Sequence, residues 1–253
     1  MELPLLLLTI SATVVLITFL IASYQDLRTR TVYTVTWYPA AIICAICIIW
    51  FWILKFSPEA LPVLILSLLT AALMATFTFF GLFGKADAKA MILLSLAVPV
   101  TPFAAYYFPS LAVSSIINAG VLVLLVSLVL LLRNLIAKNK APFWLMISGM
   151  PVSGEKITKY FGFISEKIGR DKDGTITREF VRVTDTVTAL KNGQSIRALR
   201  EKPEDYTKEL ALYASAGKIW ISYGIPFMIP LTIGYIFALF GFSLVDIVLS
   251  LIL

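Results

Sequence analysis

The sequence contains six long apolar segments, separated by short stretches that hold most of the charged residues. An apolar run of about 20 residues is long enough to cross the hydrocarbon core of a bilayer as a helix. The pattern therefore predicts an all-α polytopic membrane protein with six transmembrane helices. These spans are expected at residues 4–25, 35–54, 60–82, 88–107, 112–136 and 219–240.

The composition excludes the ordinary soluble and disordered classes of protein. Hydrophobic residues make up 59% of the 253 residues and charged residues 14%, against roughly 45–50% and about 25% in soluble domains. The chain has no histidine and only 2 cysteines, so a histidine metal site is excluded and a disulfide framework is not expected. We predict no cofactor and no metal ion. The net charge of +6 is attributed to cytoplasmic loops, and no nucleic-acid partner is expected.

The distribution of Lys and Arg predicts how the chain is oriented in the membrane. Cytoplasmic loops are enriched in these residues, and they concentrate after the first, third and fifth spans. The loop after the second span holds only Lys55, and the loop after the fourth holds no charge. We therefore expect a multi-pass protein of the cell membrane with both termini outside. The residues that place the other loops in the cytoplasm are Arg28, Arg30, Lys85, Lys89, Arg133, Lys138 and Lys140.

A polar segment at 137–217 is predicted to form a small cytoplasmic domain. It lies between a first part, 1–136, with five spans, and a last part, 218–253, with the sixth span and a tail. The dipeptides Asp173-Gly174 and Asn192-Gly193 are typical of hairpin turns. The β-branched stretch between them, and Ser195–Leu199 after it, predict a three- or four-stranded antiparallel sheet. Pro203 indicates the start of a helix.

Proline and glycine interrupt the last predicted span. Pro226 and Pro230 lie within it, close to Gly224 and Gly234. Proline frees backbone carbonyls and bends a membrane helix. One interpretation is a structural kink. The other is a locally unwound segment beside a site that admits an extended peptide.

Two aspartates give the main functional signal. Asp26 lies at the inner end of the first span, and Asp87 lies at the inner start of the fourth. Acidic residues at membrane depth are rare and often functional. Each also has a structural explanation: Asp26 would pair with a nearby arginine, and Asp87 would cap a helix. Together, however, they are the only carboxylates on the inner side of the first five spans, at the same expected depth.

Two carboxylates in one site can share a proton and perform aspartic-protease chemistry. The ionised group deprotonates a water molecule, and the neutral group protonates the scissile carbonyl or the leaving nitrogen. Asp26 is expected near a helix C-terminus, which disfavours negative charge, and Asp87 near an N-terminus, which favours it. On this argument Asp87 is the base and Asp26 is the acid.

The residues around both aspartates resemble those of a known family. Asp26-Leu-Arg-Thr-Arg after a first span, and Gly84-Lys85-Ala86-Asp87 before a fourth, are similar to motifs of the archaeal preflagellin peptidases. These are type IV prepilin-like leader peptidases of the GxGD aspartyl protease class, which is distantly similar to presenilin. The resemblance implies that Asp26 and Asp87 are catalytic, with Gly84, Lys85 and Ala86 supporting them. Ala86 replaces the second glycine of the strict motif.

The resemblance also implies the substrate and the place of cleavage. The substrate would be a preflagellin or prepilin-like preprotein of the archaeal flagellum type, with a short basic leader before a hydrophobic segment. This signal peptide processing would occur at the cytoplasmic face, after a small residue. Acids of the 137–217 segment are either contacts for the leader or an ordinary solvated surface. They are Glu155, Glu166, Glu179, Asp185, Glu201, Glu204, Asp205 and Glu209.

Two other functions are compatible with membrane carboxylates. A proton-coupled transporter would use Asp26 and Asp87 to carry protons. Transporters, however, tend to have inverted repeats and sites near the midplane, whereas these acids lie at one edge and no repeat is visible. A non-catalytic membrane scaffold for filament assembly is the second alternative.

Overall fold

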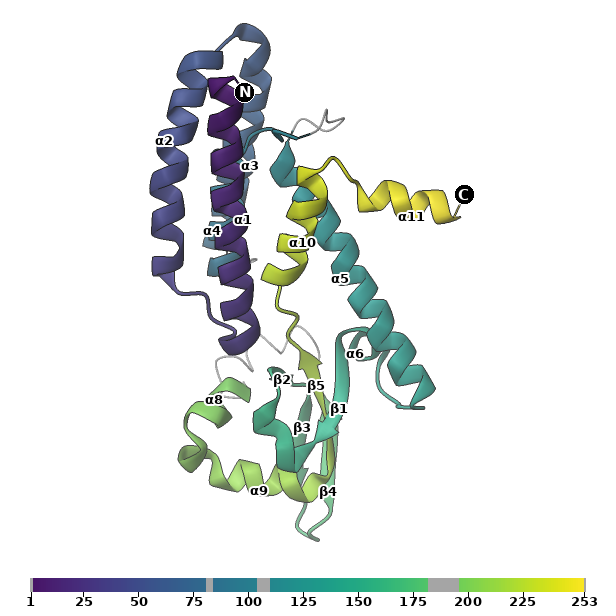
Figure 1. The fold of residues 1–253 in the computed structure, drawn as a ribbon. Coiled ribbons are helices and arrows are strands. Elements are labelled where there is room, and N and C mark those ends of the chain that lie inside the picture. Colours follow the sequence, from purple (N-terminus) through teal and green to yellow (C-terminus); the bar gives the residue numbers. More distant parts are fainter. Residues whose placement is uncertain (1, 81–83, 104–109, 182–195, 253) are drawn as a thin grey trace. The chain divides into compact units, whose positions relative to one another are not determined.

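The computed structural model describes residues 2–80, 84–103, 110–181 and 196–252. The chain divides into two compact units (Figure 1). The membrane unit combines residues 1–123 with 226–253, and the polar unit consists of residues 124–225. Each unit has its own core of buried side chains.

The membrane unit is built from helices. α1 contacts α2, α4 and α10, and α4 also contacts α2 and α3 (Figure 1). α5 begins in the membrane unit and ends in the polar unit. The helices are α1 (Leu3–Thr29), α2 (Tyr38–Lys55), α3 (Leu61–Phe79), α4 (Lys85–Ala97), α5 (Leu111–Ile136), α10 (Met228–Leu239) and α11 (Leu244–Ile252), with 3-10 turns η1 (Thr34–Trp37) and η2 (Pro58–Ala60).

Within the described residues, 4 helices are long and apolar enough to cross a membrane, rather than the six expected. They are Leu3–Thr29, Thr34–Lys55, Pro58–Phe79 and Leu111–Ile136. The fourth predicted span is shorter than expected, because α4 ends at Ala97 after 13 residues. Val98 leaves the helical conformation, as expected for a residue that precedes a proline. Residues 104–107 of that span lie outside the described part.

The sixth predicted span is wrong over its first third. Lys218–Tyr223 forms the strand β5, and helix α10 begins only at Met228 and is 12 residues long. β5 is the central strand of a sheet, and Ile219, Trp220 and Ile221 are all buried. A continuous apolar run of this kind fits a buried strand or a helix equally well.

Small residues let the helices of the membrane unit approach closely. Gly234 of α10 lies against α5: a Cβ added there would be 2.6 Å from the carbonyl oxygen of Ser115. Ala12, Ala22 and Ala90 are fully buried in the same core. Close backbone approach through small side chains is a common basis of helix association in membranes.

The described residues of the polar unit form two antiparallel sheets. The first has the order β1 (Gly149–Ser153), β5, β2 (Gly162–Ile164), and the second is the hairpin of β3 (Glu166–Arg170) and β4 (Ile176–Phe180). A core of this unit includes Ile157, Ile164 and Ile219, and Leu145 and Met146 form a separate cluster with Trp220. Short helices pack beside the sheets. These are α6 (Phe143–Ser148), α8 (Ile196–Glu201), α9 (Thr207–Ala216), η3 (Gly154–Lys159) and η4 (Pro203–Tyr206).

The hairpin predictions for this unit are partly confirmed. Asp173-Gly174 forms the turn between β3 and β4, where Gly174 has a φ of 80°. The helix predicted at Pro203 begins there as η4 and continues as α9. The strand predicted at Ser195–Leu199 is wrong over residues 196–199, because α8 begins at Ile196 and buries Ile196 and Leu199. Ser195 and the dipeptide Asn192-Gly193 lie outside the described residues.

Candidate active site

Asp26 lies in the last turns of α1, which ends at Thr29. Its side chain is partly buried. The backbone N–H of Met228, the first residue of α10, donates to the Oδ2 of Asp26 at 3.4 Å. This is a long hydrogen bond, but it joins the end of one helix to the beginning of another. The carboxyl of Asp26 therefore lies at the N-terminus of α10.

Two prolines lie at the start of α10, where the N–H of Met228 faces Asp26. Pro226 lies before α10, and its carbonyl oxygen accepts a hydrogen bond from the N–H of Ile229. Pro230 lies in the first turn of α10 and has no N–H to offer. The prolines therefore shape the start of the helix and do not kink its middle. The interpretation of the sequence that expected a structural kink is wrong. The N–H of Met228 has no acceptor within the helix because it belongs to the first residue of α10.

Asp87 lies in the first turn of α4. Gly84 occupies the N-cap position of this helix. The alternative interpretation of Asp87 as the helix cap is therefore wrong. The side chain of Asp87 folds back over Gly84, because a Cβ added to Gly84 would lie 2.8 Å from Oδ2. Gly84 has an extended backbone with a φ of −62° and a ψ of 143°, which other residues also adopt. Its role here is to leave space for the carboxyl.

Asp26 and Asp87 lie on two helices that contact each other, α1 and α4. The charge of Asp26 acts on the carboxyl of Asp87. Both carboxyls lie at helix N-termini, Asp87 at that of α4 and Asp26 at that of α10. The dipole argument that made Asp87 the base and Asp26 the acid assumed that only Asp87 had such a position. It therefore no longer separates the two roles.

The remaining motif residues lie at the start of α4. Lys85 is exposed, and Ala86 is partly buried against the core of the membrane unit. Lys89, one turn further, donates to the Oγ1 of Thr34 at 3.1 Å. Ala86 thus packs in the position where the strict motif has glycine.

Sequence reasoning missed the contribution of α10. The donor to Asp26 is a backbone amide of Met228, and an amide has no side-chain signature. It also missed Gln25, whose Oε1 accepts from the N–H of Tyr33 at 3.1 Å and the Oγ1 of Thr36 at 3.0 Å. These bonds tie the loop after α1 back to the turn that precedes Asp26.

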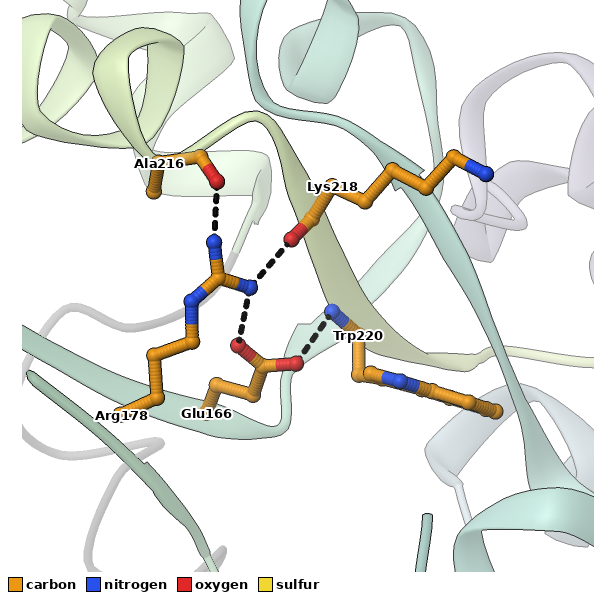
Figure 2. Close-up of polar contacts among 5 residues, drawn as sticks. All are labelled: Glu166, Arg178, Ala216, Lys218 and Trp220. Atoms are coloured by element: carbon orange, nitrogen blue, oxygen red, sulfur yellow. Dashed lines mark hydrogen bonds and ion pairs between the residues drawn. The ribbon is translucent and has the colours of Figure 1, made fainter. Parts of the chain in front are cut away.

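In the polar unit, one of the acids considered for leader binding proves to be buried. Glu166 is 3% exposed, and its Oε2 lies 3.5 Å from Nη1 of Arg178 (Figure 2). Its Oε1 accepts from the N–H of Trp220 at 3.0 Å. Arg178 also donates to the carbonyl oxygens of Ala216 and Lys218. Burial raises the pKa of Glu166 above its ordinary value, and Arg178 and the Trp220 N–H partly oppose this shift.

This arrangement makes Glu166 structural. Through Arg178 it fastens the β3–β4 hairpin to the segment that contains β5, so it belongs neither to a leader-binding surface nor to a solvated one. Asp185, another of those acids, lies outside the described residues.

Two family models match the chain and together extend over nearly all of it. Residues 13–136, which include both aspartates, match the type IV leader peptidase family. Residues 141–241 match the archaeal peptidase A24 C-terminus, type II. The chain belongs to the type IV leader peptidase family. Its second match supports the resemblance to the archaeal preflagellin peptidases. The search of curated proteins found no match to the chain.

Membership of the leader peptidase family establishes a coarse function. The chain is a peptidase, and its four long apolar helices agree with a membrane location. A leader peptidase acts on a preprotein, so the family also implies the kind of substrate. The matches do not favour the alternative of a proton-coupled transporter.

Proposed function

We propose that this leader peptidase is an intramembrane aspartyl endopeptidase with Asp26 and Asp87 as its catalytic pair. Its substrate is a preflagellin or prepilin-like preprotein, from which it removes a short basic leader. Cleavage occurs at the cytoplasmic membrane face, and both termini of the enzyme lie outside.

The observation that carries the proposal is that α1 and α4, which hold Asp26 and Asp87, contact each other. The charge of Asp26 acts on Asp87, and both belong to the part of the chain that matches the leader peptidase family. Neighbouring carboxyls resist ionising together, so one retains a proton. A pair in this state contains both the base and the acid that peptide hydrolysis requires.

The reaction then follows from the two protonation states. The ionised carboxylate takes a proton from a water molecule, which attacks the scissile carbonyl carbon. The neutral carboxyl gives its proton to the carbonyl oxygen, which forms a tetrahedral intermediate with two hydroxyls. The carboxyl that accepted the water proton then protonates the nitrogen. The C–N bond breaks as the other carboxylate takes back a proton from a hydroxyl, which leaves a carboxylic acid and an amine. The two carboxyls exchange roles during the cycle, so they act as one pair. Gly84 leaves space for the Asp87 carboxyl, and the Met228 N–H orients that of Asp26.

The proposal is tested by cleavage of a defined preprotein. The full chain in detergent or liposomes is mixed with a preflagellin whose leader contains Lys and Arg, and mass spectrometry identifies the new N-terminus. The proposal expects one cut after a small residue at the end of the leader. A matched substrate with the basic residues of the leader changed to Gln should be cut more slowly. Absence of cleavage of the first substrate by the intact chain would contradict the proposed substrate class.

A further inference from the structure

Two hydroxyl groups contact the same residue of α10 whose N–H faces Asp26. The Oγ of Ser23 lies 2.9 Å from the carbonyl oxygen of Met228, and the Oγ1 of Thr232 lies 2.7 Å from it. The two hydroxyls are 2.8 Å apart. Met228 is therefore bound through its N–H by Asp26 and through its carbonyl oxygen by Ser23 and Thr232.

The spacing of these residues explains how two helices form one cluster. Ser23 and Asp26 are three residues apart in α1, and Met228 and Thr232 are four apart in α10, so each pair lies on one helix face. The Oγ1 of Thr232 also lies 3.3 Å from the carbonyl oxygen of Phe19. Thr232 is 4% exposed, so its hydroxyl is satisfied by protein groups and not by bulk water. A shift of α10 along α1 would break the contacts with Ser23 and Asp26 together.

Hydroxyls elsewhere in the membrane unit provide a contrast. Thr70 of α3 and Ser95 of α4 are also buried, but each donates to a carbonyl four residues earlier in its own helix. Such bonds satisfy the hydroxyl without fixing one helix against another. Thr232 makes such a bond as well, to Met228, but it also contacts Ser23 and the carbonyl oxygen of Phe19 in α1. Ser23 and Thr232 therefore bridge α1 and α10, directly beside a proposed catalytic carboxyl.

We propose that Ser23 and Thr232 are positioning residues for Asp26. They fix the register of α10 on α1 so that the Met228 N–H faces Oδ2 and orients the carboxyl toward Asp87. This inference rests on the proposed function, since it assigns the orientation of Asp26 a role in peptide hydrolysis. Neither hydroxyl exchanges a proton with the substrate, so their effect is on geometry alone.

The test compares Thr232→Val with Thr232→Ser in the full chain. Valine keeps the shape but removes the hydroxyl, and serine retains the hydroxyl. Thr70→Val is the matched control, because Thr70 has the same side chain and is 6% exposed. Preprotein cleavage is measured over a range of substrate concentrations. Thr232→Val should lower kcat by roughly tenfold to a hundredfold and change KM by less than about twofold. Thr232→Ser and Thr70→Val should stay close to wild type.

Amide hydrogen exchange supplies a readout that does not depend on activity. The peptide that contains Met228 should exchange faster in Thr232→Val and in Ser23→Ala than in the wild type. Its exchange rate should be unchanged in Thr70→Val. The double variant should lose little more kcat than Thr232→Val alone, because both hydroxyls act on one residue.

The outcomes separate this inference from the proposed function. A wild-type chain that cleaves no preprotein would contradict the proposed function, and the exchange data alone would then decide whether the hydroxyls hold Met228. A wild-type chain that cleaves, with Thr232→Val equally active, would overturn the positioning role. Equal losses in Thr232→Val and Thr232→Ser would also overturn it, because the hydroxyl would then be irrelevant.

Discussion

The backbone N–H of Met228 lies 3.4 Å from the Oδ2 of Asp26, although the two residues are 202 positions apart in the sequence. The bond joins the segment that matches the leader peptidase family to the segment that matches the archaeal C-terminal model. Asp26, in the first matched segment, therefore accepts a hydrogen bond from Met228, in the second.

Gly84→Ala should reduce peptide cleavage while leaving the fold stable. The added Cβ would lie 2.8 Å from the Oδ2 of Asp87, so the carboxyl must move. The backbone of Gly84 suits alanine, so the unfolding temperature should change little. We expect kcat/KM to fall about tenfold or more, which corresponds to roughly 1.4 kcal/mol. Gly120→Ala is the control, because its Cβ would meet nothing within 4 Å. Full activity in Gly84→Ala would show that the carboxyl does not need that space.

Gly234→Ala should destabilise the membrane unit. Its Cβ would lie 2.6 Å from the carbonyl oxygen of Ser115 and 2.7 Å from the backbone N of Ala119. Backbone atoms cannot move aside as a side chain can, so α10 and α5 must separate. Overpacking of this kind costs about 1–3 kcal/mol. Thermal unfolding in detergent measures the effect against Gly120→Ala, and an unchanged melting temperature would contradict the close packing.

Arg178→Met should destabilise the polar unit. The substitution leaves the carboxylate of Glu166 buried without its cation and removes the bonds to two backbone carbonyls. Loss of one partner of a fully buried ion pair costs about 3–5 kcal/mol, and we expect about 2–3 kcal/mol here because Arg178 is 40% exposed. Arg197→Met is the control, because its pair with Glu201 is exposed on both sides. Equal melting temperatures for the two variants would argue against a structural role for Glu166.

Glu166 should also make the stability of the chain depend on pH. Its pKa in the folded chain is raised above the ordinary 4.5 by burial. Its favourable contribution is therefore complete below pH 4.5 and is lost as the pH rises through the folded pKa. Glu166→Gln cannot ionise and lacks this loss. The melting temperature of the wild type minus that of Glu166→Gln should thus decrease between pH 4 and pH 7. A difference that increases over this range would mean that Arg178 outweighs burial.

Much of this architecture was predictable from the sequence, and the failures have physical causes. Charge and hydropathy located α1, α2, α3 and α5, because a helix exposed to lipid needs a long apolar run. The same signal failed at β5, since a central strand buried on both faces is also uniformly apolar. α4 was predicted too long, because the apolar run continues past Val98 although the proline after it ends the helix.

The candidate site was predictable in its side chains and not in its backbone. Two isolated acids, Asp26 and Asp87, stand out in an apolar sequence by their rarity alone. The donor that contacts Asp26 is an amide of Met228, and the sequence carries no mark of which amide a fold leaves available. The burial of Glu166 was also hidden, because its partner Arg178 lies on the opposite strand of a hairpin.

The central claim is tested most directly by cleavage rates of Asp26→Asn and Asp87→Asn. Asparagine keeps the shape of the side chain but cannot exchange the proton that the reaction requires. Asp246→Asn is the matched control, because Asp246 is an exposed carboxyl of the same unit on α11. The account predicts that Asp26→Asn and Asp87→Asn each lose cleavage by at least about a thousandfold, while melting temperatures stay near wild type and Asp246→Asn remains active. Near-normal turnover in either Asp26→Asn or Asp87→Asn would contradict the account.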